Sequence, residues 1–513
     1  MYGRIEEHIA KRIAEDPQRE CVVFEGARLS RAQIGGLTAL CRANLEASGF
    51  KAGMRLVTIL PNSPLMLALS AAVWQLKGTV VPLSHYAGVD LVIGAIKLVD
   101  PFAVVTIQGV KELEALAEKL TAMGIPTHCV SVAEPLPVIT GRADASLEDP
   151  SMAVIFATSG TTGLPKAVPL THENMLADIF NTCEHVYLEI NQPHTVLTLL
   201  PNFHVFGFCL SSILPLVMGY KQVVLPSFMP PSRTLNALYK EGITVIIVVP
   251  TIVGMLCEGI ARGPKVPPPC LKKIVCGGAP CDPKLYAKAQ TFLGVPIHEG
   301  YGLTESASVV AAVHEESEAR PGFIGPFIKC FERQLRTTDG QVITDGDEGV
   351  QWIKGPCVAK GYFRMPQATA ERYDNGWFNT GDVVKLYDDG YMKILDRATD
   401  IIIVSGFNVY PQEVENFLNT HPAVADCAVV GSPNSISGEV VKAFVVLNPG
   451  VPAPTERELI NFCKETLSHY KAPRIIEFTQ ELPRSAVGKV LRRKLRDLER
   501  QRFAARGQKE KTE

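Results

Sequence analysis

The chain contains 513 residues, of which 46% are hydrophobic and 20% are charged. These proportions are those of an ordinary globular protein with a large buried core. The length corresponds to about three or four average domains, or to one large and one small domain. The formal net charge of −2 gives no reason to expect a nucleic acid as a partner. The first residues form no apolar signal segment and no apolar run reaches the length of a membrane span, so we expect a cytoplasmic protein.

The 13 cysteines are scattered along the chain. Cys276 and Cys281 are the nearest pair in the sequence, but no second pair has the spacing of zinc ligands. We therefore expect reduced thiols, which agrees with a cytoplasmic location.

The first 150 residues alternate between helical and strand patterns. Apolar residues recur at helical spacing in Ala32–Ser48, Met66–Gln75 and Lys111–Met123. Short apolar runs typical of strands occupy Met54–Leu60, Thr79–Pro82 and Thr127–Val132. This alternation predicts an α/β fold with layered, mostly parallel sheets, and Gly141–Pro150 is a polar loop.

The next stretch, Thr158–Lys166, reads Thr-Ser-Gly-Thr-Thr-Gly-Leu-Pro-Lys after the apolar strand Met152–Ala157. Glycine lets the backbone approach a ligand closely, and consecutive N–H groups can form a concave anion site. Hydroxyl groups add donors, and Lys166 adds a positive charge suited to phosphate. A plain Ser/Thr/Gly surface loop is the alternative. The strand before it and the Pro-Lys after it favour a phosphate site, which differs from the P-loop because no glycine directly precedes Lys166.

Further strands lead to small or polar residues. A helix is predicted at Glu173–Val186, and strands at Thr195–Leu200, Val223–Leu225, Ile243–Val249, Lys273–Cys276 and Val295–His298. His204 follows one of these strands among aromatic residues, where a histidine is more often packed than catalytic. Gly277–Pro280 offers small residues past which a flat ring could approach the backbone. Glu305 is either a solvated turn residue or, beside a phosphate loop, a ligand for Mg²⁺.

From Phe323 the pattern changes to short strands with Gly/Asp turns, which predicts a β-rich, barrel-like subdomain. Asp382 lies in a turn there, and its functional interpretation is a carboxylate that accepts hydrogen bonds from ribose hydroxyls. The charged break Asp396–Asp400 separates two apolar strands. We therefore predict an N-terminal domain over residues 1–395, a hinge at 396–400, a small, mobile α+β lid at 401–500 and a disordered polar tail at 501–513. The lid elements are predicted at Pro411–Thr420, Ala425–Val430, Val440–Leu447, Glu456–Ser468 and Arg474–Phe478.

Five motifs in order resemble the adenylate-forming superfamily, which includes acyl-CoA synthetases, the adenylation domains of peptide synthetases and firefly luciferase. They are the loop Thr158–Lys166, Pro-Asn-Phe-His at 201–204, Tyr-Gly-Leu-Thr-Glu at 301–305, Thr-Gly-Asp at 380–382 and Gly-Lys at 488–489. Each motif is modest alone, but their common order makes chance implausible. The stretch Ile402–Glu415 looks most similar to bacterial fatty acyl-CoA ligases.

The resemblance implies an ATP site. The β- and γ-phosphates would contact Thr158, Ser159, Gly160, Thr161, Thr162, Gly163 and Lys166. Adenine would be framed by Gly277, Gly278, Ala279, Pro280, His298, Glu299, Gly300, Tyr301 and Gly302. Thr304 would contact the α-phosphate, Glu305 would hold Mg²⁺, and Asp382 with Arg397 would bind the ribose hydroxyls.

It also implies an acyl and a thiol site. His204 would gate the acyl pocket, and Lys489 would bridge the substrate carboxylate and the α-phosphate. Ser405, Gly406 and Phe407 would line a tunnel for the thiol after rotation of the small domain. Three positions depart from the common pattern: Ala167 replaces a glycine, Thr399 replaces the charged hinge residue, and Asp396 replaces a glycine.

The resemblance implies an AMP-forming acid–thiol ligase that makes acyl-AMP and pyrophosphate and then transfers the acyl group to CoA. Since no acid follows Phe203, where amino-acid-activating domains carry an aspartate, we expect an uncharged-tail acid, fatty in preference to aryl. Alternatives are transfer to the phosphopantetheine arm of an acyl carrier protein, a luciferase-like oxygenase and a non-catalytic nucleotide-binding protein. The oligomeric state and any weak association with a membrane stay open.

Overall fold

The computed structural model describes residues 2–84, 88–158, 166–314, 318–434, 438–484 and 490–509. The chain divides into two compact units. The first comprises Met1–Arg333, Ile353–Phe378 and Asp388–Met392, and the second comprises Gln334–Trp352, Asn379–Tyr387 and Lys393–Glu513. The segments Gln334–Trp352 and Asn379–Tyr387, which we expected in the N-terminal domain, thus belong to the second unit.

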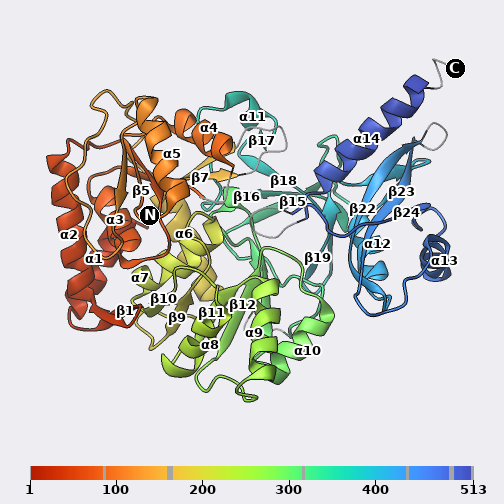
Figure 1. Ribbon diagram of the computed structural model, residues 1–513, viewed down its shortest axis with the longest axis horizontal. Coiled ribbons are helices and arrows are strands. Elements are labelled where there is room, and N and C mark those ends of the chain that lie inside the picture. The colour runs from red at the N-terminus through yellow and green to blue at the C-terminus, as the bar shows by residue number, and fades with distance from the viewer. Residues whose placement is uncertain are drawn as a thin grey trace. The chain divides into compact units, whose positions relative to one another are not determined.

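A six-stranded sheet in the first unit confirms the predicted parallel α/β arrangement (Figure 1). Its order is β6-β5-β3-β4-β7-β8, and all neighbours are parallel except β7 and β8. The strands are β3 (Arg55–Ile59), β4 (Thr79–Pro82), β5 (Ala103–Ile107), β6 (Thr127–Val130), β7 (Met152–Thr158) and β8 (Lys166–Thr171).

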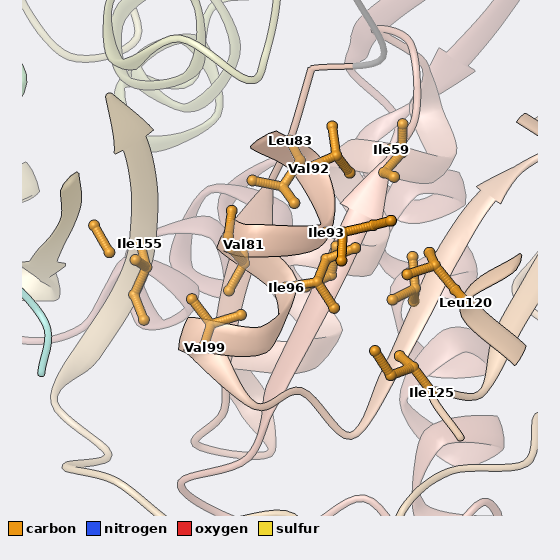
Figure 2. Packing of buried hydrophobic residues seen from close by; sticks show 14 of the residues in the cluster. Ile59, Val81, Leu83, Val92, Ile93, Ile96, Val99, Leu120, Ile125 and Ile155 are labelled. Carbon is orange, nitrogen blue, oxygen red and sulfur yellow. The ribbon is translucent and has the colours of Figure 1, made fainter. Parts of the chain in front are cut away.

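Two amphipathic helices, α4 (Val89–Val99) and α5 (Lys111–Ala122), contribute to the apolar core on this sheet. Figure 2 shows how Val92, Ile96 and Val99 of α4, which recur at helical spacing, lie over apolar strand residues. This core fixes the sheet whose strand ends carry the phosphate loop.

An eight-stranded sheet forms the other half of the first unit, in the order β14-β13-β12-β11-β9-β10-β1-β2. Only its outermost pairs, β1 with β2 and β13 with β14, are antiparallel. The strands are β1 (Glu20–Phe24), β2 (Ala27–Ser30), β9 (Thr195–Thr198), β10 (Lys221–Val224), β11 (Val245–Val248), β12 (Lys273–Gly277), β13 (Ile297–Tyr301) and β14 (Ala311–Ala312). The helices that accompany it in sequence include α8 (Pro231–Lys240), α9 (Pro250–Arg262) and α10 (Pro283–Phe292).

A helical layer links the two sheets. It includes α3 (Pro64–Gln75), α6 (His172–His185) and the π-helix η1 (Phe206–Ile213). Trp74 of α3 donates a hydrogen bond from Nε1 to the Ala153 carbonyl in β7 (2.8 Å), and its ring packs edge-on against Phe208 of η1 (centroids 6.2 Å apart). Because α3 is apolar on all sides, it requires burial on all sides. Outside this layer, α1 (Ile5–Glu15), α2 (Arg31–Ala47) and the short α7 (Leu214–Met218) complete the N-terminal part.

The β-rich part predicted after Phe323 is a five-stranded sheet with the path β15-β16-β18-β17 and β19 beside β18. Its strands are β15 (Glu332–Arg336), β16 (Glu348–Lys354), β17 (Tyr373–Asp374), β18 (Trp377–Leu386) and β19 (Met392–Arg397), with the short helix α11 (Pro366–Ala370) between β16 and β17.

The C-terminal sheet of the second unit has the path β21-β20-β23-β22, with β24 beside β23. Its strands are β20 (Ile402–Val404), β21 (Phe407–Val409), β22 (Val424–Asn434), β23 (Gly438–Leu447) and β24 (Ile475–Phe478). Helices α12 (Pro411–Leu418) and α13 (Glu456–Thr466) bury Val414, Leu418 and Leu459 in its core. This unit has the predicted α+β character.

Helix α14 (Arg492–Lys509) corrects one prediction, because it continues through the range expected to be disordered from Gln501 as far as Lys509. Arg502 forms an ion pair with Glu499 in the preceding turn (2.9 Å) and another with Glu477 of β24 (2.7 Å). These contacts anchor a segment whose composition alone resembles a disordered tail. No helix among the described residues is long and apolar enough to cross a membrane.

Candidate active site

The ends of the phosphate loop are held by two antiparallel strands. Thr158 ends β7 and pairs with Lys166, which begins β8, and the Thr158 hydroxyl donates a hydrogen bond to the Lys166 carbonyl (3.3 Å). The predicted phosphate ligands between them, Ser159, Gly160, Thr161, Thr162 and Gly163, lie outside the described residues. Because β7 is parallel to β4, this loop starts at the carboxyl end of a parallel strand, where α/β sheets bind ligands.

Lys166 lies within range of the charge of a second cation, Arg372, and of two carboxylates, Glu305 and Glu371. Its Nζ is 4.7 Å from the centroid of the Tyr362 ring, and among the described residues it forms no ion pair. Burial, followed by the positive charge of Arg372, lowers the pKa of Lys166. The Nε of Arg372 is itself buried without a hydrogen-bond partner. Two neighbouring cations in this state indicate a place that an anionic ligand would complete.

Glu305 lies on the same cluster, as its predicted role requires. It occupies the short 3₁₀ turn Thr304–Ser306, and its Oε1 accepts a hydrogen bond from the Tyr362 hydroxyl (2.7 Å). Its backbone carbonyl accepts one from the Ala359 amide (2.8 Å). The hydroxyl of Tyr373, whose ring centroid lies 6.0 Å from that of Tyr362, is buried without a partner, and burial raises its pKa. After the Nε of Arg372, the Tyr373 hydroxyl is the second hydrogen-bond donor near the Glu305 carboxylate that has no partner among the described residues.

A single carboxylate fits a nucleotide-bound Mg²⁺. Among the described residues, no group of three or more His, Cys, Asp or Glu side chains could hold a metal ion by itself. Mg²⁺ usually takes one or two protein carboxylates and completes its shell with water and substrate phosphates. Glu305, oriented by the Tyr362 hydroxyl and close to the two cations, is a donor of this kind.

A buried acid supports the turn that carries Glu305. Ala307 and Ser308, directly after the 3₁₀ turn, both have positive φ angles (63° and 151°), which side chains other than glycine rarely adopt. Asp178 of α6 accepts a hydrogen bond from the Val309 amide at Oδ1 (3.0 Å), while its Oδ2 is buried without a partner. Burial raises the pKa of Asp178 well above its usual range, which favours the neutral acid. A Cβ at Gly302 would lie 1.4 Å from the Ser308 carbonyl oxygen, which explains the glycine of this motif.

The two stretches predicted to frame adenine lie side by side. Gly277, at the end of β12, pairs with Gly300 of the parallel strand β13, and a Cβ at Gly277 would come within 3.0 Å of the Gly300 carbonyl oxygen. Gly278 has a φ of +84°, and Gly278, Ala279 and Pro280 are exposed. Small residues thus leave an open strip of backbone beside two strand ends, as a flat ring requires.

The side chains on β13 have different surroundings from one another. His298 and Glu299 are buried, and Tyr301 is nearly so. Glu299 accepts hydrogen bonds from the Tyr286 hydroxyl (2.5 Å) and the Cys281 amide (3.1 Å), and burial raises its pKa. The Glu299 carboxyl therefore holds the segment after Pro280 in place.

His204 follows β9 in a segment fixed by two reciprocal asparagine contacts. The Asn202 side chain donates to the Leu60 carbonyl (3.0 Å), and the Asn62 side chain donates to the Leu200 carbonyl (3.0 Å), which ties the ends of the two sheets together. His204 is half-buried, and its Nδ1 accepts from the Phe206 amide (3.3 Å), so a neutral ring carries its proton on Nε2.

The helix after His204 is a π-helix, a geometry frequent at functional sites. The Phe206 ring at its start lies 3.5 Å from the position of a Cβ at Gly277. The structure therefore brings the histidine segment next to the strip predicted to bind adenine.

In the second unit, the structure brings Asp382 and Arg397 together as predicted for a ribose site. The Arg397 Nε lies 2.8 Å from Asp382 Oδ1, and its Nη1 donates to the Thr380 carbonyl (2.9 Å). The Asp382 side chain is 4% exposed and that of Arg397 is 46% exposed. A buried carboxylate oriented by a partly exposed arginine is suited to accept hydrogen bonds from neutral hydroxyls.

The hinge segment is held by a charged network within the same unit. Buried Asp396 accepts hydrogen bonds from the Gln412 and Arg397 amides (2.8 Å each), and burial raises its pKa to about 6. Arg492, the first residue of α14, lies 3.9 Å from Asp396 and forms an ion pair with Glu415 (2.5 Å).

Arg496 of the same helix donates to the carbonyl of Thr399 (2.7 Å) and pairs with Asp400. The start of α14 thus holds the expected hinge residue. Lys489, just before this helix, lies outside the described residues.

The residues predicted for the thiol tunnel form a tight hairpin. Ser405 and Gly406, both at positive φ (51° and 86°), connect β20 to β21, which is the geometry of two-residue hairpins. Phe407 is 58% exposed and packs against the Tyr470 ring (centroids 4.9 Å apart). An exposed aromatic at a hairpin is a contact surface, and its role in a thiol tunnel stays a prediction.

Sequence reasoning missed four residues of the site in the first unit: Asp178, Tyr362, Arg372 and Tyr373. The aromatic and basic pairs Tyr362-Phe363-Arg364 and Arg372-Tyr373, shortly before the Thr-Gly-Asp motif, were the available signal for three of them. Asp178 lies in a helix without any local sign of its burial.

Comparison with known families agrees with this geometry. Residues 9–363 match the AMP-binding enzyme family, and residues 413–489 match the AMP-binding enzyme C-terminal domain. The chain belongs to the AMP-binding enzyme family. The match covers the phosphate loop, the adenine frame and Glu305, and the resemblance stated from the five motifs is therefore confirmed.

Individual relatives differ in substrate. A long-chain-fatty-acid–CoA ligase of Yersinia pestis is 36% identical over 349 residues, which are 68% of this chain but only 61% of that protein. A feruloyl-CoA synthase of Amycolatopsis sp. is 32% identical over 498 residues, which are 95% of this chain and 97% of that protein. Among solved structures, o-succinylbenzoate coenzyme A synthetase (MenE) of Bacillus subtilis with ATP and a magnesium ion matches with a TM-score of 0.81 at 28% identity over 95% of this chain and 98% of that one.

Proposed function

We propose that this protein activates a carboxylic acid with ATP, releases pyrophosphate and transfers the acyl group from acyl-AMP to the thiol of CoA. The observation that carries the proposal is the cluster of Lys166, Arg372 and Glu305, in which neither cation forms an ion pair among the described residues. This arrangement suits a polyphosphate with a divalent cation. The names of the three relatives given above, each an acid–CoA ligase or synthetase, support the same reaction class.

The first half-reaction joins two anions. A carboxylate oxygen attacks the α-phosphorus, a P–O bond forms, and the bond to pyrophosphate breaks. Positioning and charge compensation are the main contributions that a protein makes to such a transfer. Lys166 and Arg372 would hold the leaving phosphates, and Thr304 the α-phosphate. Mg²⁺, held by Glu305, would supply further charge compensation when bound. We assign to Lys489 the bridge between the carboxylate and the α-phosphate.

The second half-reaction needs a different partner at the same acyl carbon. The thiol loses its proton, its sulfur attacks the acyl carbon, and AMP leaves with the electron pair of the broken C–O bond. We propose that rotation at Thr399 exchanges the two arrangements and brings Ser405–Phe407 to the thiol. Closure would also protect the water-sensitive acyl-adenylate.

For the acyl group, we propose a carboxylic acid with an uncharged tail. The absence of an acid after Phe203 argues against an α-amino acid. A long-chain fatty acid is favoured by the ligase of Yersinia pestis and by the segment Ile402–Glu415. An aryl acid is the second candidate, because the feruloyl-CoA synthase aligns over nearly the whole of both chains.

The decisive experiment is ATP–pyrophosphate exchange with a panel of fatty acids of graded length and of cinnamate-type aryl acids. We expect exchange that depends on the added acid and on Mg²⁺, followed by thioester formation with CoA. If a thioester forms with holo acyl carrier protein and none forms with CoA, the acceptor is the carrier protein and not CoA. No exchange with any acid would refute the enzymatic function and leave the nucleotide-binding alternative.

The role of Lys489 has its own test. Lys489→Ala should reduce exchange by about 100- to 1,000-fold, the loss expected when one preorganised charge contact is removed. Thioester formation from supplied acyl-AMP should be largely retained. Equal losses in both half-reactions would contradict the assigned role.

A further inference from the structure

Two cysteines that are far apart in sequence meet in the first unit. The Sγ atoms of Cys330 and Cys357, 27 residues apart, lie 3.5 Å from each other. Their backbones are also close, since a Cβ at Gly355 would lie 2.6 Å from the Cys330 carbonyl oxygen. Both thiols are free in the structure. This spacing leaves the two sulfurs in contact but without a covalent bond.

The two thiols differ in the way that a reactive and a resolving cysteine differ. Cys330 is partly exposed, whereas Cys357 is 0% exposed. The hydrogen bond with the Cys357 thiol lowers the pKa of Cys330, and the charge of the adjacent Lys329 acts in the same direction. A partly exposed thiol with a lowered pKa next to a second cysteine is the arrangement found in oxidation-sensitive proteins.

A second pair in the same unit provides an internal comparison. The Sγ atoms of Cys276 and Cys281 are also 3.5 Å apart, but both residues are buried. The hydrogen bond with Cys276, followed by burial, raises the pKa of Cys281. The sulfur separation is equal in the two pairs, but the pair of Cys330 and Cys357 includes a partly exposed cysteine and the other pair does not, which singles out Cys330 with Cys357.

The segment around Cys357 is connected to the proposed magnesium ligand. The carbonyls of Pro356 and Val358 accept hydrogen bonds from the Asn174 side chain (2.7 and 3.2 Å). The next amide, that of Ala359, donates to the backbone carbonyl of Glu305 (2.8 Å). Bonded sulfurs lie about 2 Å apart, so bond formation must bring the two Sγ atoms closer by more than about 1 Å, and the part of this change that the side chains do not take up moves the two segments. Such a shift would reach Glu305 through a single hydrogen bond.

We propose that Cys330 and Cys357 form a reversible disulfide on exposure to a hydroperoxide, and that this modification slows the nucleotide-dependent reaction by displacing Glu305. The Cys330 thiolate attacks a peroxide oxygen, so an S–O bond forms and the O–O bond breaks, giving a sulfenic acid and, with one proton, water or an alcohol. The Cys357 sulfur then attacks the sulfenic sulfur, loses its proton and releases water. Two thiols are oxidised by two electrons, and the hydroperoxide is reduced. The effect on rate rests on the proposed function, whereas the bond itself does not.

The test treats the full chain with hydrogen peroxide and maps disulfides by mass spectrometry of non-reduced peptides. We expect a peptide that links Cys330 to Cys357 and disappears with dithiothreitol. Acid-dependent ATP–pyrophosphate exchange should fall in parallel by up to about 100-fold, as for a catalytic group misplaced by about 1 Å, and recover with dithiothreitol. Cys330→Ser and Cys357→Ala should each retain their exchange rate under peroxide, while Cys281→Ala should lose it like the wild type.

Each contrary outcome is informative. No linked peptide, or a link between Cys276 and Cys281 in its place, would refute the disulfide. A linked peptide without a change in exchange would refute its effect on Glu305. Inactivation that persists in both Cys330→Ser and Cys357→Ala would assign it to another cysteine. If the untreated protein shows no exchange with any acid, the proposed function fails, and the peptide map still decides the disulfide.

Discussion

The two parts of the candidate site differ in whether their charged side chains form ion pairs. In the first unit, Lys166 and Arg372 form no ion pair among the described residues, although the charges of Glu305 and Glu371 act on Lys166, and no described residue forms a hydrogen bond with the Tyr373 hydroxyl. In the second unit, Asp382 pairs with Arg397, and Arg492 faces both Asp396 and Glu415. The difference indicates that the first unit awaits a charged ligand, whereas the second already satisfies its charges and uses them to hold its own chain.

The largest expected effect comes from removing both unpaired cations. Lys166→Met combined with Arg372→Met should raise the KM for ATP by at least roughly 100-fold, since each charge-assisted hydrogen bond contributes about 1.5–3 kcal/mol. The folded state should not suffer, because no ion pair is lost among the described residues. Initial rates of acid-dependent exchange against ATP concentration give this value.

The matched control removes the same charges from exposed helix positions. Lys11→Met combined with Arg262→Met, on α1 and α9, should leave the KM for ATP unchanged. If the Lys166 and Arg372 variant kept the KM for ATP of the wild type, the conclusion that these two cations bind the phosphates of ATP would be wrong.

The second prediction concerns the pH dependence of stability in the second unit, where the charged side chains are paired. Burial raises the pKa of Asp396 from 3.8 to about 6, so between these values the folded chain retains a proton that the unfolded chain has lost. Its contribution to the free energy of unfolding is therefore fully present below the unfolded pKa and is lost as the pH rises through about 6. The loss amounts to at most about 3 kcal/mol.

Hydrogen exchange of peptides from α12 measures this effect, with Asp396→Asn as the reference at each pH, because the intrinsic pH dependence of exchange then cancels. Protection in the wild type should fall relative to the variant between about pH 4 and pH 7. A constant difference across that range would mean that Asp396 is ionised throughout, as in an ordinary ion pair with Arg492.

The third prediction tests whether Asp178 supports the turn of Glu305 through its hydrogen bond or through a negative charge. Asp178→Asn keeps an oxygen for the Val309 amide, and because burial favours the neutral form of Asp178, the change to a neutral amide should have little effect. Asp178→Leu leaves the buried amide without an acceptor and should lower the free energy of unfolding by about 1–3 kcal/mol. It should also weaken the dependence of exchange on Mg²⁺ concentration, since Glu305 lies in the supported turn.

Thermal unfolding and Mg²⁺ titration of the exchange rate provide the two readouts. A strong effect of Asp178→Asn would show that the acid is ionised and contributes charge. A loss of stability in Asp178→Leu without a change in Mg²⁺ dependence would confine Asp178 to a structural role.

Much of this site could be predicted from local sequence. Glycines with backbone requirements, such as Gly302 and Gly277, and motif residues that follow strands, such as Glu305, reveal their positions through spacing. Asp178 could not be found in this way, because its significance arises from burial and from a neighbour more than one hundred residues away. The adjacent basic and aromatic residues Arg372 and Tyr373 were a local signal, but this signal alone does not indicate a site. The ribose role of Asp382 was predicted from its own segment, whereas its partner Arg397 was identified only through the resemblance to a family.

The fold shows the same division. The helices over Ala32–Ser48 and Pro411–Thr420 and the strand over Thr127–Val132 were located to within a few residues, because amphipathic periodicity is local. The strand Lys166–Thr171 was missed, since its pairing with β7 is decided by the sheet. The tail from Gln501 was assigned to disorder from its polarity, yet Arg, Lys, Leu, Glu and Ala are also strong helix formers, and Glu499 and Glu477 anchor the helix.

The smallest expected effect tests whether the Asp382 carboxylate, which is paired with Arg397, accepts a hydrogen bond from a ribose hydroxyl. If Asp382 accepts a hydrogen bond from ribose, wild-type exchange should prefer ATP to 2′-deoxy-ATP or 3′-deoxy-ATP by about fivefold, the equivalent of one hydrogen bond of about 1 kcal/mol. Asp382→Asn should reduce this preference, because an amide presents one acceptor oxygen where the carboxylate presents two. Arg397→Lys should act in the same direction by loosening the bond that orients Asp382. The ratio of kcat/KM for the nucleotide pair isolates the ribose contact from any general loss of activity. An unchanged ratio in both variants would mean that the pair only stabilises the strand turn, and that ribose recognition lies elsewhere.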